Sequence, residues 1–338
     1  MITRRPFLRR VAAVPGLLLT SVIPASAQPV PGQPSPAQRG GQSFAQFLDG
    51  VRAEARRAGV SQATLNRALS NIRPQDRVLE LDRRQPEFTL TWEQYRDRQI
   101  SQTRIDRGRQ IYADNRSLLE AIGARYRVNP RVVVAIWGME TNYGSFTGNF
   151  NVVEALATLA WEGRRATFFR AELMAALRIL DAGNVTPERM RGSWAGAMGQ
   201  PQFMPTSYER LAVDFDGDGR RDIWDSRGDA LGSIANYLAR SGWQEDQRWG
   251  REAVLPASFD PTDARLDNKR PLRDWARAGV RTSDGAALPV ADFDASVLLP
   301  GGANGQAFIV YPNFGAIRRY NPSTFYALGV GLLSDRVA

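Results

Sequence analysis

Glu140 is the side chain in this sequence best placed for acid–base chemistry, because it follows an apolar run in segment 135–144, beside Trp137 and Met139. A carboxyl group in apolar surroundings loses the solvation of its ionised form, and this loss raises its pKa. A raised pKa suits a general acid that protonates a glycosidic oxygen near neutral pH, as does the lysozyme glutamate that packs against a tryptophan. The alternative is a glutamate at a helix end that points into solvent.

The composition leaves few other groups for such chemistry. The 338 residues include no histidine and no cysteine, and Lys269 is the only lysine. Histidine-dependent triads, histidine-bound metals, disulfides and zinc–thiolate sites are therefore excluded. Hydrophobic residues make up 43% of the chain and charged residues 23%, which is typical of a folded globular protein. We therefore expect any general acid or base to be mainly a carboxyl group.

Residues 193–208 combine small residues with hydrogen-bonding and aromatic ones. Glycines such as Gly196 let the backbone approach a ligand closely, whereas Ser193 and Gln202 offer hydrogen bonds. The ring of Phe203 offers a flat apolar face of the kind that sugars contact. The alternative is a tight loop that packs on the core, but that would not require Ser193 and Gln202 so near each other.

An acidic loop follows at 214–219 and matches the opening of an EF-hand calcium loop, D-x-D-x-D-G. The predicted carboxylate ligands are Asp214, Asp216 and Asp218. Arg220 stands at the seventh position, where only a backbone carbonyl is needed, and Asp225 stands at the twelfth, where glutamate is expected. The interpretation is a structural Ca²⁺ site, and the alternative is a solvated acidic turn.

Helical spacing of apolar residues dominates the rest of the chain. It predicts helix within 42–68, with Ser61 as an N-cap, and one long helix or two in series over 92–126. Further helices are expected over 129–142, 152–160, 166–180, 229–241 and 321–333. Residues 192–228 are expected to be mostly loops, and short apolar runs between prolines and glycines predict a small β-rich insertion at 250–312. The fold class is α+β, mostly α.

The N-terminus predicts export. Residues 1–27 have a basic start, an apolar stretch and a small-residue cleavage site, as in a signal peptide. Residues 3–9 resemble a twin-arginine signal, and the alternative is a general secretory signal that begins with paired arginines. Removal of 1–27 leaves 40 basic and 35 acidic residues, a formal charge of +5, which suits an anionic polymer outside the cytoplasm. We expect a soluble periplasmic monomer that binds no nucleic acid and has no membrane span, with a flexible leader at 28–41.

Five motifs in order carry a family resemblance. They are ETNYG at 140–144, GSWAGAMGQPQFMPTSY at 192–208, VDFDGDG at 213–219, GSIANYL at 232–238 and RYNPSTFYA at 319–327. Together the motifs resemble the lytic murein transglycosylase B family over about residues 42–333. The resemblance implies a lysozyme-like core and cleavage of the β-1,4 bond between N-acetylmuramic acid and N-acetylglucosamine in peptidoglycan. The product would be a 1,6-anhydromuramyl end, formed without water.

The resemblance also implies a division of the chain and a set of site residues. The helical region would span 42–128, the lysozyme-like core with the EF-hand-like loop 129–249, the β-rich subdomain 250–312, and 313–338 would return to the catalytic cleft. Glu140 matches the catalytic acid and base, and Asp229 matches the acid that closes a slightly longer calcium loop. Residues matching glycan-contacting positions are Arg164, Arg165, Ser193, Gln202, Phe203, Tyr320, Asn321 and Tyr326. Phe168 stands where the family often has tyrosine.

A single suitable carboxyl predicts substrate assistance, because an ordinary glycosidase places two carboxyl groups across the bond. On this hypothesis Glu140 protonates the leaving oxygen, and its carboxylate then accepts the proton of the sugar's own C6 hydroxyl as that oxygen attacks C1. Two rival functions remain from the sequence. One is a non-catalytic peptidoglycan-binding or scaffold protein, and the other is a muramidase that uses water.

Overall fold

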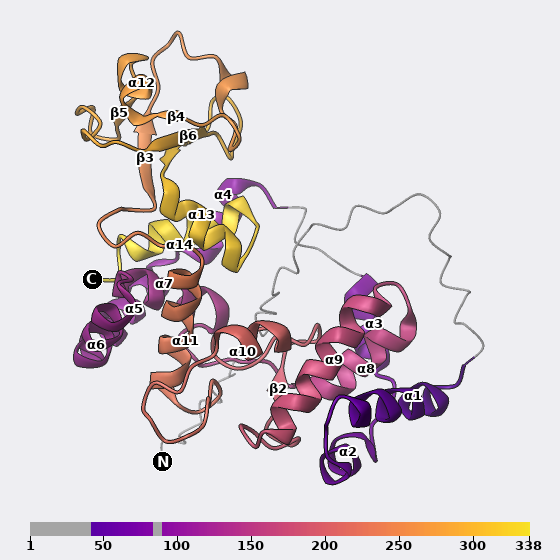
Figure 1. Cartoon of the computed structure of the whole chain (residues 1–338). Coiled ribbons are helices and arrows are strands. Elements are labelled where there is room, and N and C mark those ends of the chain that lie inside the picture. Colours follow the sequence, from indigo (N-terminus) through magenta and orange to yellow (C-terminus); the bar gives the residue numbers. More distant parts are fainter. Residues whose placement is uncertain (1–41, 84–89) are drawn as a thin grey trace, which may run out of the picture.

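The computed structural model describes residues 42–83 and 90–338 and confirms the mostly helical α+β fold (Figure 1). The predicted signal peptide, 1–27, and leader, 28–41, lie outside the described residues. The first helices are α1 (Phe44–Arg57), α2 (Gln62–Leu69), α3 (Asp76–Arg83), α4 (Trp92–Gln99), α5 (Gln102–Asp114) and α6 (Arg116–Tyr126). The later ones are α7 (Pro130–Thr141), α8 (Val152–Glu162), α9 (Ala166–Asp181), α10 (Pro205–Leu211), α11 (Arg227–Arg240), α12 (Leu272–Arg277), α13 (Pro312–Tyr320) and α14 (Thr324–Ser334).

The helix starts follow capping chemistry. Ser61 caps α2 as predicted, because its side chain accepts a hydrogen bond from the Thr64 amide. The prediction of one or two helices over 92–126 was wrong, since the segment forms α4, α5 and α6. Ile100 leaves the helical region, Ser101 caps α5, and Asn115 separates α5 from α6. The apolar period continues across these breaks because all three helices pack on one core.

The described helices bury two separate cores. The first joins α1, α2, α3, α8, α9 and α10, and the second joins α4 to α7, α11, α13 and α14. Figure 1 shows α1–α3, α8 and α9 gathered on one side of the molecule and α4–α7 on the other. Tyr320, at the end of α13, packs against both cores. The two helical bodies therefore meet near the C-terminal segment.

A small antiparallel sheet forms a third core at one end of the molecule, next to α13 (Figure 1). Its strands are β3 (Gly250–Val254), β4 (Arg270–Pro271), β5 (Arg281–Thr282), β6 (Asp294–Leu298) and β7 (Ala307–Val310), in the order β4-β6-β7-β3-β5. All five lie inside the segment predicted to be β-rich. The segment also contains α12 and a 3₁₀ turn at Pro261–Asp263, which the short apolar runs did not indicate. A separate two-stranded ribbon pairs β1 (Phe150–Asn151) with β2 (Arg191–Gly192).

Two further corrections concern short helices. The segment predicted to be loops contains α10, which begins with Pro205 in its first turn. The C-terminal helix expected at 321–333 begins later, as α14, and a further helix, α13, comes before it. Helix α13 ends at Tyr320, and Asn321 has extended backbone. Ser323 then caps α14 by accepting a hydrogen bond from the Tyr326 amide. The break turns α14 back against α7.

Gly331→Ala is expected to lower the free energy of unfolding by about 1–2 kcal/mol. A Cβ at Gly331 would clash with the buried indole of Trp249, and overpacking of this kind outweighs the better helix propensity of alanine. The matched control is Gly329→Ala in the same helix, where the new Cβ would meet the flexible end of Met139 at 3.1 Å. Chemical denaturation of both variants checks this, and equal stability loss would contradict it.

Candidate active site

Glu140 lies in the last turn of α7, a helix whose sequence makes it buried on every side. Asn129 caps the helix, Pro130 occupies its first position, and every residue over 132–141 is buried. The helix is packed by α5, α6, α11 and α14. The Glu140 side chain is consequently only 8% exposed, and this burial raises the pKa of its carboxyl from its usual value to about 7.

Tyr326 of α14 is the hydrogen-bonding partner of that carboxyl. Its hydroxyl donates to Glu140 Oε1 at 2.6 Å. This bond lowers the pKa of Glu140, but the desolvation caused by burial is the larger effect. Burial first, and then the Glu140 carboxylate, raise the pKa of Tyr326 well above its ordinary value. The phenol therefore keeps its proton and can donate it in a hydrogen bond to the ionised Glu140 carboxylate.

The turn after Glu140 is an unusual run of left-handed backbone. Asn142, Tyr143 and Gly144 have φ values of 48°, 62° and 76°. The Thr141 hydroxyl donates to the Gln200 carbonyl at 2.9 Å and ties this turn to the loop at 193–204. A side chain at Gly144 would place its Cβ 2.7 Å from Gln200 Oε1, so glycine is required there. The ETNYG motif thus fixes the backbone that directly follows the acid.

The loop at 193–204 is held by its own polar groups. The Ser193 hydroxyl accepts a hydrogen bond from the Ala197 amide at 3.1 Å, and its side chain is buried. Gln202 has a left-handed φ of 51°, and its amide group donates to the Thr147 and Gly199 carbonyls at 3.0 and 2.8 Å. Ser193 and Gln202 therefore shape this loop, which Thr141 joins to the end of the Glu140 helix.

Three aromatic rings pack together where this loop meets the C-terminal segment. Phe203 is only 2% exposed, and its ring contacts those of Tyr237 and Tyr320 at centroid distances of 5.6 and 5.8 Å. The Tyr320 hydroxyl donates to the Pro201 carbonyl at 2.6 Å. After burial, the nearby Glu140 charge is the next cause that raises the pKa of Tyr320. The buried Phe203 ring thus packs against two tyrosine rings, and one of these, Tyr320, is close enough to Glu140 to respond to its charge.

Asn321 holds the start of α14, because its side-chain oxygen accepts a hydrogen bond from the Ser323 amide at 3.0 Å. Tyr237 was not named from the sequence, although it belongs to the GSIANYL motif on α11. Its ring lies 4.6 Å from that of Tyr320. The only sequence signal for Tyr237 was its place in a motif, because the contact joins residues far apart in the chain.

Arg164 and Arg165 lie at the corner between α8 and α9. Arg164 forms an ion pair with Asp82 of α3 and also donates to the Asp82 carbonyl at 2.8 Å. The Arg165 guanidinium stacks 4.6 Å from the centre of the Phe168 ring. Within the described residues, the contacts of this arginine pair are therefore with α3 and α9. The residues that act on Glu140 are instead Tyr326 and Tyr320.

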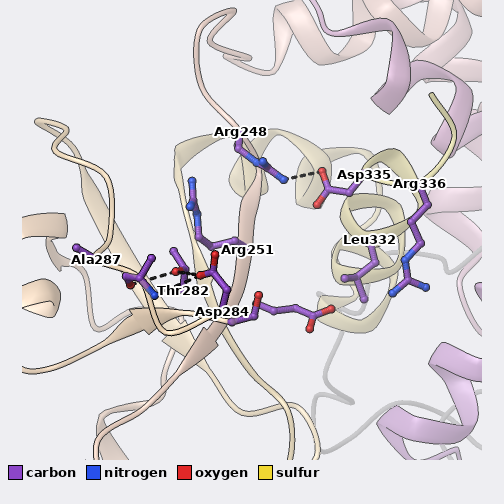
Figure 2. Close-up of a pocket in the computed structure, with 11 residues that line it drawn as sticks. Arg248, Arg251, Thr282, Asp284, Ala287, Leu332, Asp335 and Arg336 are labelled. Atoms are coloured by element: carbon purple, nitrogen blue, oxygen red, sulfur yellow. Dashed lines mark hydrogen bonds and ion pairs between the residues drawn. The ribbon is translucent and has the colours of Figure 1, made fainter.

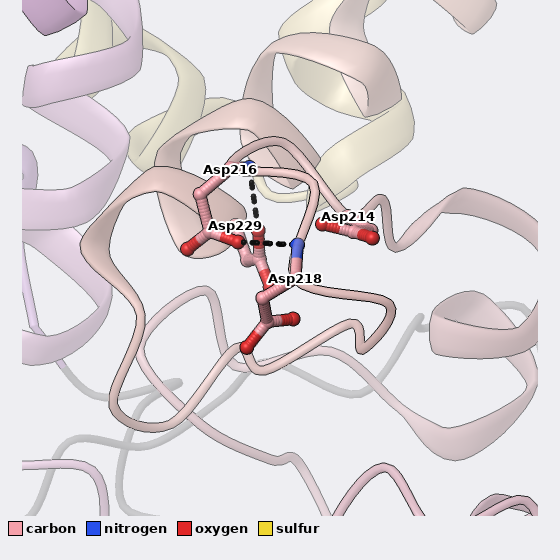
Figure 3. A group of neighbouring side chains, drawn as sticks. All are labelled: Asp214, Asp216, Asp218 and Asp229. Atoms are coloured by element: carbon pink, nitrogen blue, oxygen red, sulfur yellow. Dashed lines mark hydrogen bonds between the residues drawn. The ribbon is translucent and has the colours of Figure 1, made fainter.

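Four carboxylates come together where the acidic loop meets the first turn of α11, as Figure 3 shows. They belong to Asp214, Asp216, Asp218 and Asp229, and one oxygen from each lies within 4.8 Å of the others. Asp225, the residue at the twelfth EF-hand position, instead forms an ion pair with Arg189. Asp229 is therefore the acid that closes the group. The Arg220 side chain faces Asp218, with 3.6 Å between its Nε and the carboxylate.

The loop is organised around the buried Asp229. Its two oxygens accept hydrogen bonds from the amides of Phe215 and Asp222, both at 2.7 Å. Ser226 caps α11 by accepting a hydrogen bond from the Asp229 amide. Because α11 packs on α7, the acidic loop is connected through one helix to the element that carries Glu140.

Comparison with known proteins gives consistent matches. Residues 43–335 match the family described as the transglycosylase SLT domain. The chain is 33% identical over 310 residues to membrane-bound lytic murein transglycosylase B of Escherichia coli, covering 87% of this chain and 82% of that protein.

Two solved structures are also similar. The first is SltB3 from Pseudomonas aeruginosa in complex with NAG-anhNAM-pentapeptide, with a TM-score of 0.86 and 50% identity, covering 88% of this chain and 80% of that one. The second is the Escherichia coli lytic transglycosylase Slt35 in complex with calcium, with a TM-score of 0.74 and 33% identity, covering 87% of this chain and 92% of that one.

Tyr326→Phe is expected to raise the pKa of Glu140 above its value of about 7, because it removes the hydrogen bond that favours the carboxylate. A ¹³C NMR titration of the glutamate side chains measures this change. The control is Tyr237→Phe, which removes a hydroxyl that donates to the Arg319 carbonyl and should leave the Glu140 pKa unchanged. A Glu140 pKa that stays constant or falls in Tyr326→Phe would refute the assignment.

Proposed function

Since this chain belongs to the transglycosylase SLT family and is a lytic transglycosylase of peptidoglycan, we propose that Glu140 is its single catalytic acid and base. The bond cleaved is the β-1,4 bond between N-acetylmuramic acid and N-acetylglucosamine. The product carries a 1,6-anhydromuramyl end. The complex of SltB3 with NAG-anhNAM-pentapeptide supports this product class, because the bound fragment contains an anhydro sugar.

The observation that carries the proposal is the environment of Glu140 compared with the other buried carboxyls among the described residues. Asp82 is paired with Arg164, Glu172 accepts two hydrogen bonds from Thr206, and Asp222 and Asp229 accept backbone amides. These groups are occupied in holding the fold. Glu140 has a tyrosine hydroxyl as its hydrogen-bond partner and a pKa of about 7, which suits a group that must both give and take a proton.

In the first step, the protonated Glu140 carboxyl transfers its proton to the glycosidic oxygen as the bond from that oxygen to C1 of the muramic sugar breaks. Positive charge develops at C1, and the N-acetyl group of the sugar or the surrounding electrostatics stabilises it. The Tyr326 hydroxyl, 2.6 Å from Glu140 Oε1, stabilises the carboxylate that has formed.

In the second step, the C6 hydroxyl oxygen of the same sugar attacks C1, and the Glu140 carboxylate accepts the hydroxyl proton. This restores the protonated acid and closes the 1,6-anhydro ring. The nucleophile belongs to the same sugar ring, and such an intramolecular reaction has an effective molarity that lets it outpace attack by water.

The loop and aromatic residues are proposed to bind the glycan. Ser193, Gln202 and Phe203 shape the loop joined to the Glu140 helix, and Tyr320 and Asn321 hold the segment that presents Tyr326. The pair Arg164 and Arg165 is proposed to contact the glycan farther along its length, because the pair lies at the α8–α9 corner.

We also propose that the acidic loop binds Ca²⁺ in a structural role. The donor set fits this ion, because carboxylate oxygens are its preferred ligands and four of them converge here. Asp214, Asp216, Asp218 and Asp229 would hold the ion, together with the Arg220 carbonyl. The loop is longer than that of an EF-hand, because Asp229 stands 15 residues after Asp214. The calcium complex of Slt35 supports the choice of metal. Bound calcium would offset about half of the formal charge of the four carboxylates and fix the start of α11.

Export to the periplasm is proposed from residues 1–27 and from the location of peptidoglycan outside the cytoplasm. A twin-arginine route is part of this proposal, as is a monomeric protein whose partner is the glycan strand. Within residues 42–83 and 90–338, no helix is both long and apolar enough to cross a bilayer.

Glu140→Gln is expected to lower the rate of peptidoglycan cleavage by roughly three orders of magnitude or more, because the amide cannot donate a proton. For the unchanged enzyme, kcat/KM should fall about tenfold per pH unit above pH 7, since the acid must be protonated to start the reaction. Mass spectrometry of the digest should find anhydro ends, each lighter by one water than the product of hydrolysis.

The matched control is Glu154→Gln on α8, which changes a partly buried glutamate bonded to Gln75 and should retain activity. Thermal melting of both variants verifies that they fold. Residual activity of Glu140→Gln above about a tenth of the unchanged enzyme would refute the role of Glu140. Ordinary reducing ends would identify a muramidase, and intact glycan would identify a binding protein.

Calcium is expected to raise the melting temperature, because a ligand at a hundredfold excess over Kd stabilises the folded state by about 2.7 kcal/mol. Magnesium should have a smaller effect, since it prefers a compact octahedral, partly hydrated site. Asp216→Ala should remove most of the calcium response. Asp225→Asn is the matched control, because Asp225 belongs to the same loop but pairs with Arg189 outside the group. Equal melting curves in calcium and in chelator, starting from metal-free protein, would contradict the site.

A further inference from the structure

Tyr143, in the turn after Glu140, has a backbone conformation that its side chain disfavours. Its φ is 62°, and left-handed backbone brings the Cβ of any residue other than glycine close to a carbonyl oxygen. Among the described residues, four that are not glycine have left-handed backbone, and Tyr143 is the only aromatic and the only buried one. Such strain persists only where surrounding contacts hold it, and it is concentrated at functional sites.

The Tyr143 ring fills a slot between α5 and α7 that exists because two residues have no side chain. A Cβ built at Gly108 of α5 would overlap the Tyr143 hydroxyl oxygen. A Cβ built at Gly138 of α7 would lie 2.6 Å from Cε1 of the same ring. The ring is only 4% exposed, so it has little room to move aside. Both glycines are therefore needed for the ring to occupy the slot.

The third wall of the slot is the chain directly after α14. Val337 is fully buried, and its Cγ1 would lie 2.6 Å from a Cβ on the glycine of α5. Arg109 of α5 donates a hydrogen bond to the Arg336 carbonyl at 2.9 Å. Asp335 forms an ion pair with Arg248 at the edge of a pocket beside the sheet, as Figure 2 shows. These two contacts hold the third wall in place.

Both ends of Tyr143 are bonded to helices. Its hydroxyl donates to the Arg104 carbonyl of α5 at 2.8 Å. Burial raises the pKa of this hydroxyl to about 12, so that it keeps its proton and donates at neutral pH. Its backbone amide donates to the Trp137 carbonyl at 3.2 Å and closes the last turn of α7, which carries Glu140. Tyr143 thus joins the end of α7 to α5.

The slot and the acid lie on opposite faces of α7. Gly138 and Glu140 are two residues apart, which is about 200° around a helix with 3.6 residues per turn. Tyr143 therefore holds the turn from the side away from the acid. The Thr141 hydroxyl holds it separately, through its hydrogen bond to the Gln200 carbonyl in the neighbouring loop.

We propose that Tyr143 is a positioning residue for the Glu140 carboxyl, because it anchors the strained turn in the slot against α5. This proposal rests on the proposed function, since the carboxyl that Tyr143 positions is the acid and base assigned there. Glu140 must reach the glycosidic oxygen first and the C6 hydroxyl afterwards. A displacement of about 1 Å is enough to lower the rate of such a reaction by as much as about a hundredfold.

Gly108→Ala is the main test, because it adds one methyl group on α5 that displaces the Tyr143 hydroxyl and leaves every residue of the proposed site in place. It should lower kcat about tenfold and leave KM within about twofold of its original value, since the glycan contacts are unchanged. The Glu140 pKa should fall below its value of about 7, because a loosened turn admits water to the carboxyl. A ¹³C NMR titration of the glutamate side chains measures this fall without any reaction.

A second substitution and a control separate the tyrosine from the rest of the core. Tyr143→Phe alone should lower kcat by at most about threefold, because it removes one hydrogen bond and keeps the ring. Added to Gly108→Ala, it removes the overlapping hydroxyl and should restore kcat to that of Tyr143→Phe. The matched control is Gly123→Ala on α6, whose Cβ would lie 2.9 Å from Pro130 Cγ at the other end of α7. It should lower stability but change neither kcat nor the Glu140 pKa.

An unchanged kcat and Glu140 pKa in folded Gly108→Ala would overturn the proposal. A double variant whose loss equals the product of the two single losses would also overturn it, because the methyl group would then act independently of the tyrosine. If Gly108→Ala does not fold, Tyr143→Leu takes its place, with the same expected fall in kcat and in pKa and the same refuting result.

Failure of the proposed function is distinguishable from failure of this inference. If the unchanged full chain cleaves no peptidoglycan, the proposed function fails, and the titration of Glu140 alone then decides the role of Tyr143. A lower Glu140 pKa in Gly108→Ala than in Gly123→Ala would support the positioning role. Equal pKa values in these two variants would overturn it.

Discussion

The contact between Glu140 and Tyr326 is the constraint on which the rest of this structure depends. A carboxyl has a pKa near 7 only when burial removes the water that would stabilise its ionised form. The hydrogen bond from Tyr326 favours the ionised form, so its effect on the pKa must stay smaller than that of burial. The fold meets the first requirement by burying α7 among four other helices. It meets the second by bringing one phenol from a helix 186 residues later in the chain. Burial and partner thus come from different parts of the sequence.

Backbone geometry also keeps that carboxyl in place. Three successive residues after Thr141 adopt left-handed conformations, each of which costs energy for a non-glycine residue. The Thr141 hydroxyl links this turn to the loop at 193–204, and Tyr320 links the same loop to the C-terminal segment. The acid therefore sits where the two helical cores are joined by hydrogen bonds to backbone carbonyls.

The sequence predicts the local features well and the distant contacts poorly. The α7 helix and its buried acid follow from adjacent residues, because an apolar run acts over one helix. The breaks near Ser101 and Asn115 were missed since the apolar period continues through them on one core. Motif resemblance alone indicated Tyr326, whereas the aromatic contact of Tyr237 with Tyr320 needs three-dimensional proximity. The EF-hand spacing pointed to Asp225 and the resemblance to Asp229, and the path of the loop brings Asp229 to the group and leaves Asp225 paired with Arg189.

Helix α14 gives the molecule a physical link between Glu140 and the sheet subdomain. One end presents Tyr326 to the acid, and Asp335, directly after the other end, forms an ion pair with Arg248 beside the sheet. A helix is stiff over this length, so the distance between the two ends is set by the backbone and not by a flexible linker. The close packing of Gly331 against the Trp249 indole fixes how α14 lies on its neighbours. The sheet subdomain is therefore positioned relative to the acid by the same helix that supplies the acid with its partner.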